Sequence, residues 1–281
     1  MIDLHTHSTF SDGTLTPTEL IRKAERLGLS AIALTDHNTV EGLPEFLVAG
    51  KESTVEAVPG VEFSTEYQGI ELHILALFVE PAQYAPITAL LEDFRQRKER
   101  SNEELVENLR HVGICIDYES LRASADGYLN RAVIGAEMLK MGYVTSVQEA
   151  FRKYLAPERG YYIPPRRPDA YETIRFIKSL GTTAVLAHPF LNLTETQLRQ
   201  FLPEAVACGL DAMETEYPKY APETMLLAQV IAEDYGLLPS GGSDFHGKNK
   251  PDIAMGTGRE NLYVQDSWLM PLRSRIKVAE K

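Results

Sequence analysis

The feature of this sequence that most limits its fold is a repeated order of a short apolar run, a polar cluster and a helix with recognisable ends. Residues 2–4, Ile-Asp-Leu, are predicted as the first strand. Residues 16–19, Thr-Pro-Thr-Glu, then supply an N-cap hydroxyl, a proline in the first turn and the glutamate of a capping box. Gly28 provides the stop of that helix, and the apolar run 31–34 follows it. Such alternation predicts an α/β protein.

The same order returns in the second half of the chain. Residues 183–187 are predicted as a strand, and residues 194–197 form a capping box that opens a helix ending near Gly209. Later elements follow the same pattern: a strand at 210–214, a helix from Pro222 to Tyr235, a strand at 237–238, and a last strand and helix near 262–264 and 268–278.

One pair of apolar runs departs from this order. Residues 55–62 and 72–79 are separated by a turn that contains Gln68 and Gly69, which is too short for a helical crossover. We therefore expect these two strands to pair antiparallel.

The length of 281 residues corresponds to about two domains at roughly 150 residues each, although α/β barrels of this size often form one. Between residues 84 and 166 the sequence has helical stretches but no convincing strand. Three prolines within residues 164–168 end this segment. We expect a barrel formed by residues 1–83 and 167–281, with 84–166 as a helical insertion.

The charge and composition indicate which kinds of molecule this protein binds. Forty acidic against 28 basic residues give a net charge of −12, which disfavours nucleic acid and anionic membranes and favours a small substrate. No apolar stretch is long enough to span a membrane or to act as an export signal. Two cysteines, Cys115 and Cys208, are too few for a disulfide framework, so we expect a cytoplasmic protein. No heptad pattern is present, and a monomer is the default expectation.

Histidine is placed in an unusual way in this chain. Six of the seven histidines lie at or beside predicted strand ends: His5, His7, His37, His73, His188 and His246. Acidic residues accompany them in Asp36-His37 and in Asp244-Phe245-His246, and Asp12 follows the first pair. In a barrel the carboxyl ends of the strands converge, so these groups are expected to meet and bind metal. Imidazole and carboxylate ligands without cysteine favour Zn²⁺, Mn²⁺ or iron, among which the sequence does not choose.

These motifs resemble those of the polymerase and histidinol phosphatase (PHP) superfamily of metal-dependent phosphoesterases. The resemblance rests on five segments in family order: Asp3-Leu4-His5-Thr6-His7-Ser8, Thr35-Asp36-His37, Gly60-Val61-Glu62, Ala187-His188-Pro189 and Ser243-Asp244-Phe245-His246-Gly247. The chain is most similar to small stand-alone phosphatases with a helical insertion, some of which act on nucleoside phosphates. This resemblance implies a distorted (β/α)7 barrel that holds two or three divalent metal ions.

The resemblance also implies a role for each candidate residue. One ion would be held by His5, His7, Glu62 and Asp244; Glu62 would bridge to a second ion completed by His73 and His188; and Asp12, His37 and His246 would hold a third. Asp3 and Asp36 would fix the tautomers of metal-bound imidazoles. Asp12, His188 and His246 are also predicted as catalytic residues. Whether His188, His246 or a metal-bound water protonates the leaving group stays open.

Two arginines of the insertion are predicted to bind substrate. Relatives in this branch often begin a helix with arginine, proline and histidine and end it with Gly-Tyr-Val; here Arg131-Ala132-Val133 leads to residues 142–144, Gly-Tyr-Val. Arg131 keeps the arginine, whereas Val133 replaces the histidine. Arg159 occupies a position that is commonly basic. Either guanidinium would offer planar donors to a phosphate.

The sequence therefore predicts a hydrolase that cleaves a phosphate ester of a small metabolite through a hydroxide that bridges two metal ions. A nucleotide, either AMP or a 3′,5′-bisphosphorylated nucleoside, is the preferred substrate. The alternatives are a sugar phosphate or its cyclic ester, histidinol phosphate, a nuclease of the same superfamily, and a metal-binding regulatory protein without catalysis.

Overall fold

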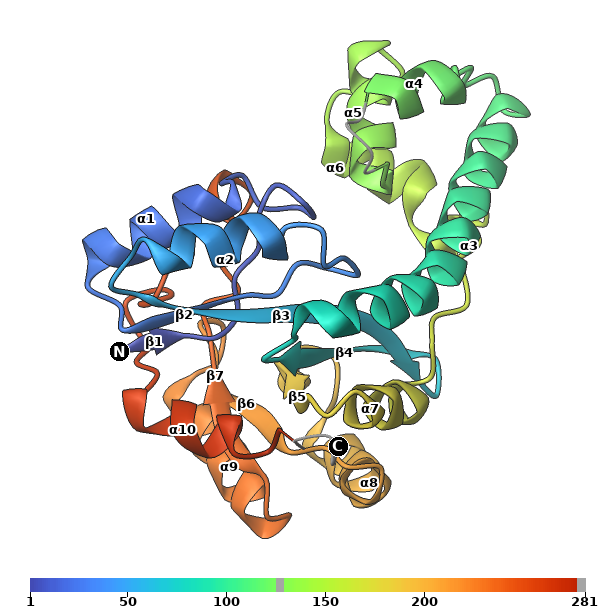
Figure 1. Cartoon of the computed structure of the whole chain (residues 1–281). Coiled ribbons are helices and arrows are strands. Elements are labelled where there is room, and N and C mark those ends of the chain that lie inside the picture. The colour runs from blue at the N-terminus through green and yellow to red at the C-terminus, as the bar shows by residue number, and fades with distance from the viewer. Residues whose placement is uncertain (125–128, 277–281) are drawn as a thin grey trace. The chain divides into compact units, whose positions relative to one another are not determined.

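Seven strands form a single mixed sheet in the computed structural model, which describes residues 1–124 and 129–276 (Figure 1). The strands lie in chain order: β1 (Ile2–Asp3), β2 (Ala31–Leu34), β3 (Glu56–Tyr67), β4 (Ile70–Leu77), β5 (Thr183–Ala187), β6 (Ala212–Glu216) and β7 (Leu238–Gly241). Neighbours pair in parallel from β1 to β3 and from β5 to β7, while β4 is antiparallel to both β3 and β5. The predicted antiparallel pair is confirmed.

Hydrogen bonds connect the segment after β1 to the last residue of β7 and to the segment after β7, and they bring the two ends of the sheet together. Leu4 N donates to Gly241 O (3.2 Å), Asp244 N donates to His5 O (2.8 Å), and His7 N donates to the carbonyl of Phe245 (3.0 Å). The sheet thereby nearly closes into a barrel. The predicted α/β barrel of seven strands is confirmed.

The helices that follow the strands begin and end largely where their caps predict. The first unit contains α1 (Pro17–Leu27), α2 (Leu43–Lys51), α7 (Ala170–Ser179), α8 (Glu195–Ala207), α9 (Pro222–Asp234) and α10 (Leu269–Arg273). Complete capping boxes are present at Thr16 and Thr194, and Gly28 and Gly209 follow their helices with positive φ. The sequence patterns did not reveal α2. None of the helices in the described ranges is long and apolar enough to cross a membrane.

The predicted final strand at 262–264 is wrong. Val264 forms only an isolated antiparallel bridge with Ile2. The residues that follow Ile2 do not extend this pairing, because Leu4 and His5 form their backbone hydrogen bonds with Gly241 and Asp244. The helix that follows is also shorter than predicted, since α10 covers Leu269–Arg273. Residues 277 and 278 of the predicted helix lie outside the described residues.

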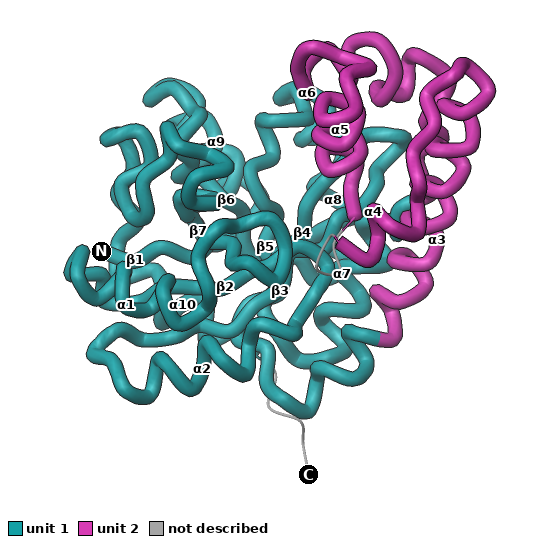
Figure 2. The backbone as a smooth tube through the Cα atoms, turned by 90° about the horizontal axis from the view of Figure 1, so that it is seen from above, with its two compact units in different colours: residues 1–88, 167–281 teal, residues 89–166 magenta. Residues whose placement is uncertain are grey.

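The chain divides into two compact units, residues 1–88 with 167–281 and residues 89–166, coloured separately in Figure 2. The second unit contains most of α3 (Tyr84–Arg110), together with α4 (Tyr118–Ser124), α5 (Arg131–Lys140) and α6 (Val147–Ala150). Its own buried core includes Leu105, Leu109, Ile134 and Met138. The described part of this unit has helices and no strand.

Candidate metal centre

The nine predicted metal ligands come together at one end of the barrel in the first unit. They come from β3 and β4 and from the segments that follow β1, β2, β5 and β7: His5, His7, Asp12, His37, Glu62, His73, His188, Asp244 and His246. Their ligand atoms form four overlapping groups, and within each group these atoms all lie within 4.8 Å of one another. The expectation that distant strand ends deliver these side chains to one place agrees with this geometry.

Glu62 lies at the middle of the cluster and is fully buried. Its Oε2 atom is 3.2 Å from Nε2 of both His5 and His7 and 2.9 Å from Nδ1 of His37. A buried carboxylate needs such partners, because an isolated charge in a protein interior is strongly unfavourable. One oxygen of Glu62 therefore faces the imidazoles that follow β1 and β2.

The other oxygen of Glu62 faces a different pair of imidazoles. Its Oε1 atom is 2.7 Å from Nδ1 of His73 and 3.2 Å from Nε2 of His188. On the far side of His73, Nε2 is 3.3 Å from Oε1 of Glu71. Glu62 thus has the geometry of a carboxylate that can serve two cations at once, one at each oxygen.

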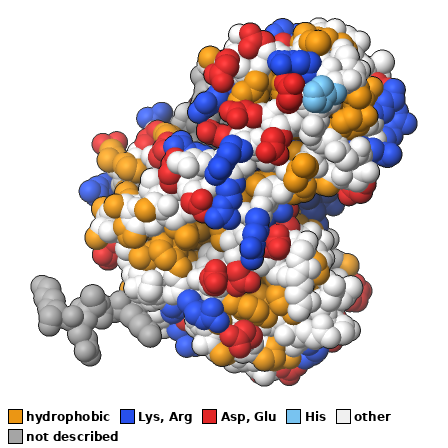
Figure 3. All heavy atoms as spheres, turned by 90° about the vertical axis from the view of Figure 1, so that its right-hand side faces the viewer, with side chains coloured by type: hydrophobic (Ala, Val, Ile, Leu, Met, Phe, Trp, Pro, Cys, Tyr) orange, Lys and Arg blue, Asp and Glu red, His pale blue; other side chains and the backbone are white. Residues whose placement is uncertain are grey.

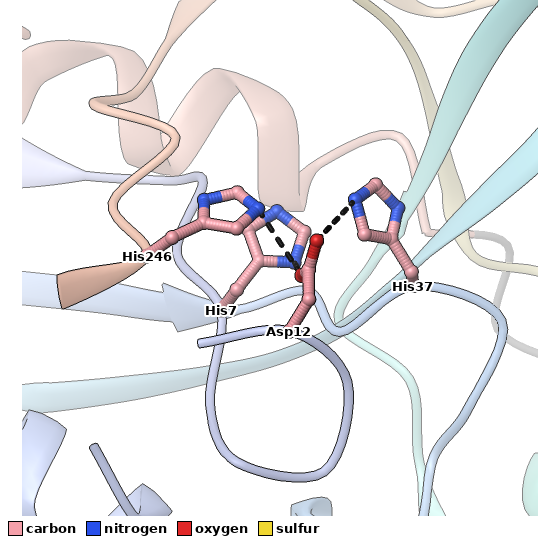
Figure 4. A group of neighbouring side chains, drawn as sticks. All are labelled: His7, Asp12, His37 and His246. Atoms are coloured by element: carbon pink, nitrogen blue, oxygen red, sulfur yellow. Dashed lines mark ion pairs between the residues drawn. The ribbon is translucent and has the colours of Figure 1, made fainter. Parts of the chain in front are cut away.

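A third part of the cluster surrounds Asp12 (Figure 4). Its Oδ1 atom is 3.2 Å from Nε2 of His246, and its Oδ2 atom is 3.9 Å from Nε2 of His37. The His7 and His246 rings lie beside it, with centroids 4.0 Å apart. The Asp12 side chain is 38% exposed, whereas that of Glu62 is inaccessible, so Asp12 is at the solvent side of the cluster.

Several buried polar atoms in this cluster lie within ion-pair distance of one another or of Asp12 but form no hydrogen bond. They are His5 Nε2, His7 Nε2, His37 Nδ1, His246 Nε2 and Glu62 Oε2. Buried polar atoms are normally paired, so converging unpaired imidazole nitrogens and a carboxylate oxygen call for a partner. Divalent ions such as Zn²⁺ or Mn²⁺ accept these donor types, and the residues present therefore fit a metal centre.

The metal-free cluster has strongly shifted pKa values. Burial by itself lowers the pKa of His7 and His73, but nearby carboxylates outweigh it: Asp244 and Glu62 raise the pKa of His7 to about 9, and Glu62 raises that of His73 to about 10. For Glu62 burial raises the pKa, and the surrounding imidazoles bring it well below its usual value. Burial and the neighbouring His7 lower the pKa of His246. The cluster thus mixes protonated and neutral imidazoles around an ionised carboxylate.

Glu214, which no sequence motif singles out, has a central structural role here. It is fully buried in β6, where its Oε1 atom is 2.9 Å from Nδ1 of His5 and its Oε2 atom accepts from the backbone N of His188 at 2.7 Å. With Nδ1–H donated to Glu214, His5 presents Nε2 to the cluster. The sequence signal was available, because residue 214 ends a predicted strand.

The predicted role of Asp3 and Asp36 in fixing imidazole tautomers stays a prediction. Among the described residues neither carboxylate contacts an imidazole ring directly, although Ser11 Oγ donates to Asp36 (2.6 Å) and lies 3.5 Å from Nδ1 of His7. Asp3 accepts from Ser243 N and Gly256 N, both at 2.8 Å, and Asp36 accepts from Ser8 N (2.7 Å). Both carboxylates are buried among loops whose backbone N–H groups need acceptors, and these donors occupy them. Asp3 and Asp36 therefore hold the loops that carry the ligands, and they do not set imidazole tautomers by direct contact.

Two of the predicted metal ligands have a positive φ, which is uncommon for residues other than glycine. His188 has φ 29° and Asp244 has φ 55°. Strained residues of this kind persist where surrounding bonds hold them, often at functional sites. Here the N–H of His188 donates to Glu214, and that of Asp244 donates to His5 O.

The two predicted substrate-binding arginines lie in the second unit. Arg131 opens α5, donates through Nη1 to Leu155 O (3.1 Å), and has its guanidinium carbon 4.2 Å from the centroid of the Tyr162 ring. Arg159 ends a 3₁₀ turn and is exposed. Arg131 thus has structural partners within its unit.

Comparison with known proteins shows the family of this chain. The PHP domain model matches residues 3–163, which is more than half of the sequence. A 5′-3′ exoribonuclease of Haemophilus influenzae is 34% identical over 87% of this chain and 89% of its own length. A 3′,5′-nucleoside bisphosphate phosphatase of Chromobacterium violaceum is 30% identical over 87% of both chains. A phosphoribosyl 1,2-cyclic phosphate 1,2-diphosphodiesterase of Eggerthella lenta is 30% identical over 88% of this chain and 94% of its own.

A solved structure agrees with these relatives. A protein from Bifidobacterium adolescentis, described as a candidate metal-dependent phosphoesterase, superimposes with a TM-score of 0.82 at 28% identity, covering 99% of this chain and 97% of its own. The chain belongs to the PHP family. The predicted enzyme class, a hydrolase that acts on phosphoric ester bonds, is confirmed.

The raised pKa values predict that metal binding releases protons. At about pH 7.5 the metal-free protein should hold protons on His5, His7 and His73, whereas a metal ligand must be neutral imidazole. Burial lowers the pKa of His5, but Glu62 and Glu214 raise it well above its usual value, and the pKa values of His7 and His73 also lie above that pH. Calorimetry of Mn²⁺ binding in buffers of different ionisation enthalpy should show release of about three protons per chain, a number that falls as the pH rises past about 9 to 10. Metal binding without proton release near neutral pH would contradict this arrangement.

Proposed function

We propose that this PHP phosphoesterase removes phosphate from a small nucleotide, with a 3′,5′-bisphosphorylated nucleoside or AMP as the substrate. The observation that carries the proposal is the division of Glu62 between two sets of imidazoles. The nucleotide is favoured by the similarity to the nucleoside bisphosphate phosphatase, which extends over 87% of both chains.

Two or three divalent ions, Zn²⁺, Mn²⁺ or iron, are proposed for this cluster. In that assignment the first ion would be held by His5, His7, Glu62 and Asp244, the second by Glu62, His73 and His188, and the third by Asp12, His37 and His246. Such ions acidify water and neutralise phosphoryl oxygens in ester hydrolysis. The convergence of the unpaired ring nitrogens supports this assignment.

The protein side chains have roles of their own in this proposal. Glu214 orients His5, and the carbonyl of Asp244 lies 2.8 Å from Nδ1 of His246, which leaves Nε2 of both rings directed into the cluster. Asp12 stays ionised near neutral pH: burial raises its pKa, but His246 and His37 bring it well below its usual value. At the solvent side it can accept a hydrogen bond from water or substrate. His188 and His246 remain the two candidate side chains for protonating the leaving group.

A second candidate is removal of nucleotides from the 5′ end of a short RNA. The similarity to the Haemophilus exoribonuclease favours it. On the face shown in Figure 3, basic and acidic side chains are interspersed among the atoms that the structure describes. That pattern, with a net charge of −12, disfavours a long nucleic acid held by its backbone and leaves a short end as the plausible RNA substrate.

A substrate panel tests the proposal. Protein reconstituted with Mn²⁺ should release inorganic phosphate most efficiently from a 3′,5′-bisphosphorylated nucleoside or AMP, and a chelator should abolish the release. The same panel contains a short 5′-phosphorylated RNA, a cyclic ribose phosphate and histidinol phosphate. For the RNA the released mononucleotide is measured, for the cyclic ester the ring-opened monoester, and for histidinol phosphate inorganic phosphate. Preference for one of those three compounds would contradict the proposed nucleotide substrate but would agree with the assignment as a phosphoesterase. Metal binding with no turnover of any of them would favour a regulatory metal protein.

A variant of the second unit tests its predicted role. Arg131→Ala should raise KM or lower kcat by about tenfold or more, because a charge-assisted bond to phosphate is lost, while metal content is unchanged. Arg152→Ala is the matched control: it removes a surface arginine of the same unit, with a side chain that is 69% exposed. Circular dichroism verifies folding, since Arg131 also contacts Leu155 O. If Arg131→Ala has the same kcat and KM as Arg152→Ala, then Arg131 does not bind the substrate.

A further inference from the structure

The two oxygens of Asp244 have different surroundings. Oδ1 faces the cluster, 3.3 Å from Nε2 of His7 and 3.7 Å from Nε2 of His5. Oδ2 accepts from the hydroxyl of Tyr217 (2.8 Å) and from Nζ of Lys250 (2.7 Å). An ammonium group therefore lies against a predicted metal ligand, on the side turned away from those two imidazoles.

Lys250 is more accessible than the other donor to this oxygen. The whole of Tyr217 is 1% exposed, whereas the Lys250 side chain is 29% exposed. An ammonium has three N–H donors, and the contact with Asp244 occupies one of them. The remaining donors are available to a ligand that enters from solvent.

The loop that carries Lys250 is fixed to the segment that carries Asp12. Lys248 N donates to Oγ1 of Thr14 (2.9 Å), and Nδ2 of Asn249 donates to the carbonyl of Asp12 (2.7 Å). The loop bonds back on itself through Ile253 N, which donates to Lys250 O (3.0 Å). These bonds fix the loop that carries Lys250 against the segment that carries Asp12.

A cation at this position is unfavourable for metal binding taken alone. A positive charge beside Asp244 repels divalent ions bound to its other oxygen, and it competes with them for the same carboxylate. Tyr217 already satisfies Oδ2 without adding charge. The position of Lys250 is explained if its charge meets an anion that arrives once the metal ions are bound.

We propose that Lys250 is a substrate-binding residue whose ammonium donates to a phosphate oxygen at the metal centre. This inference rests on the proposed function. It gives the first unit a phosphate-binding cation of its own, independent of Arg131 and Arg159. A compact ammonium that points at a non-bridging oxygen would also stabilise the charge of the transition state.

Binding of inorganic phosphate to the Mn²⁺-loaded protein, followed by calorimetry, tests the inference without requiring turnover. Lys250→Met should weaken phosphate binding by about ten- to hundredfold, because a charged hydrogen bond is lost. Lys250→Arg should recover part of the affinity. Mn²⁺ affinity of Lys250→Met should equal or exceed that of the unmodified protein, since a repelling charge is removed.

Two matched variants separate binding from positioning. Lys248→Met removes an exposed lysine two residues away and should bind phosphate normally. Tyr217→Phe removes the other donor to Oδ2 without a change of charge. If Lys250→Met binds phosphate as well as Lys248→Met does, the inference is overturned. It is also overturned if Lys250→Met loses Mn²⁺ together with phosphate, because that is the result expected when the residue, like Tyr217, only positions Asp244. Normal phosphate binding by the unmodified protein without turnover of any substrate would instead contradict the proposed function.

Discussion

The interaction on which the site depends is the burial of the Glu62 carboxylate among imidazoles. A fully buried charge is tolerated only with close partners, and here five histidines from four parts of the chain supply them: His5, His7, His37, His73 and His188. The hairpin of β3 and β4 places one of these partners. Because Glu62 pairs with Leu75 and Ser64 pairs with His73, Glu62 and His73 project from the same face of the sheet. A slip of one residue in this register would turn them to opposite faces.

Closure of the barrel supplies the rest of the cluster. Thr6 and Phe245 form a parallel bridge. The two segments that each carry a pair of predicted ligands two residues apart therefore run side by side. This pairing places Asp244 next to His5 and His246 next to His7. Gly242 permits the approach, since a Cβ at this position would lie 2.4 Å from the backbone N of His5. Residues 5–7 and 244–246, almost 240 residues apart in sequence, thus lie together in the predicted metal centre.

Much of this architecture could be predicted from the sequence because it depends on local signals. Capping residues such as Thr16 and Thr194 mark helix starts, and histidine and acidic residues at strand ends indicate where the chemistry lies. What the sequence did not reveal depends on tertiary contacts. Glu214 looks like an ordinary strand charge until the barrel brings it to His5. Lys250 looks like an ordinary loop charge until the path of its loop brings the ammonium back to Asp244, six residues earlier. Asp3 lies next to the first histidine motif, yet the backbone groups of a distant loop take its oxygens.

The central claim is that Glu62 serves two metal ions through its two oxygens, and the metal content of Glu62→Gln tests it most directly. An amide offers one oxygen and a donor group in place of the second oxygen. After reconstitution with Mn²⁺ and dialysis, elemental analysis should show that Glu62→Gln holds at least one ion fewer per chain than the unmodified protein and releases no phosphate. Glu66→Gln, an equivalent change on the same strand, should retain both properties. Full metal content and normal turnover in Glu62→Gln would contradict the account.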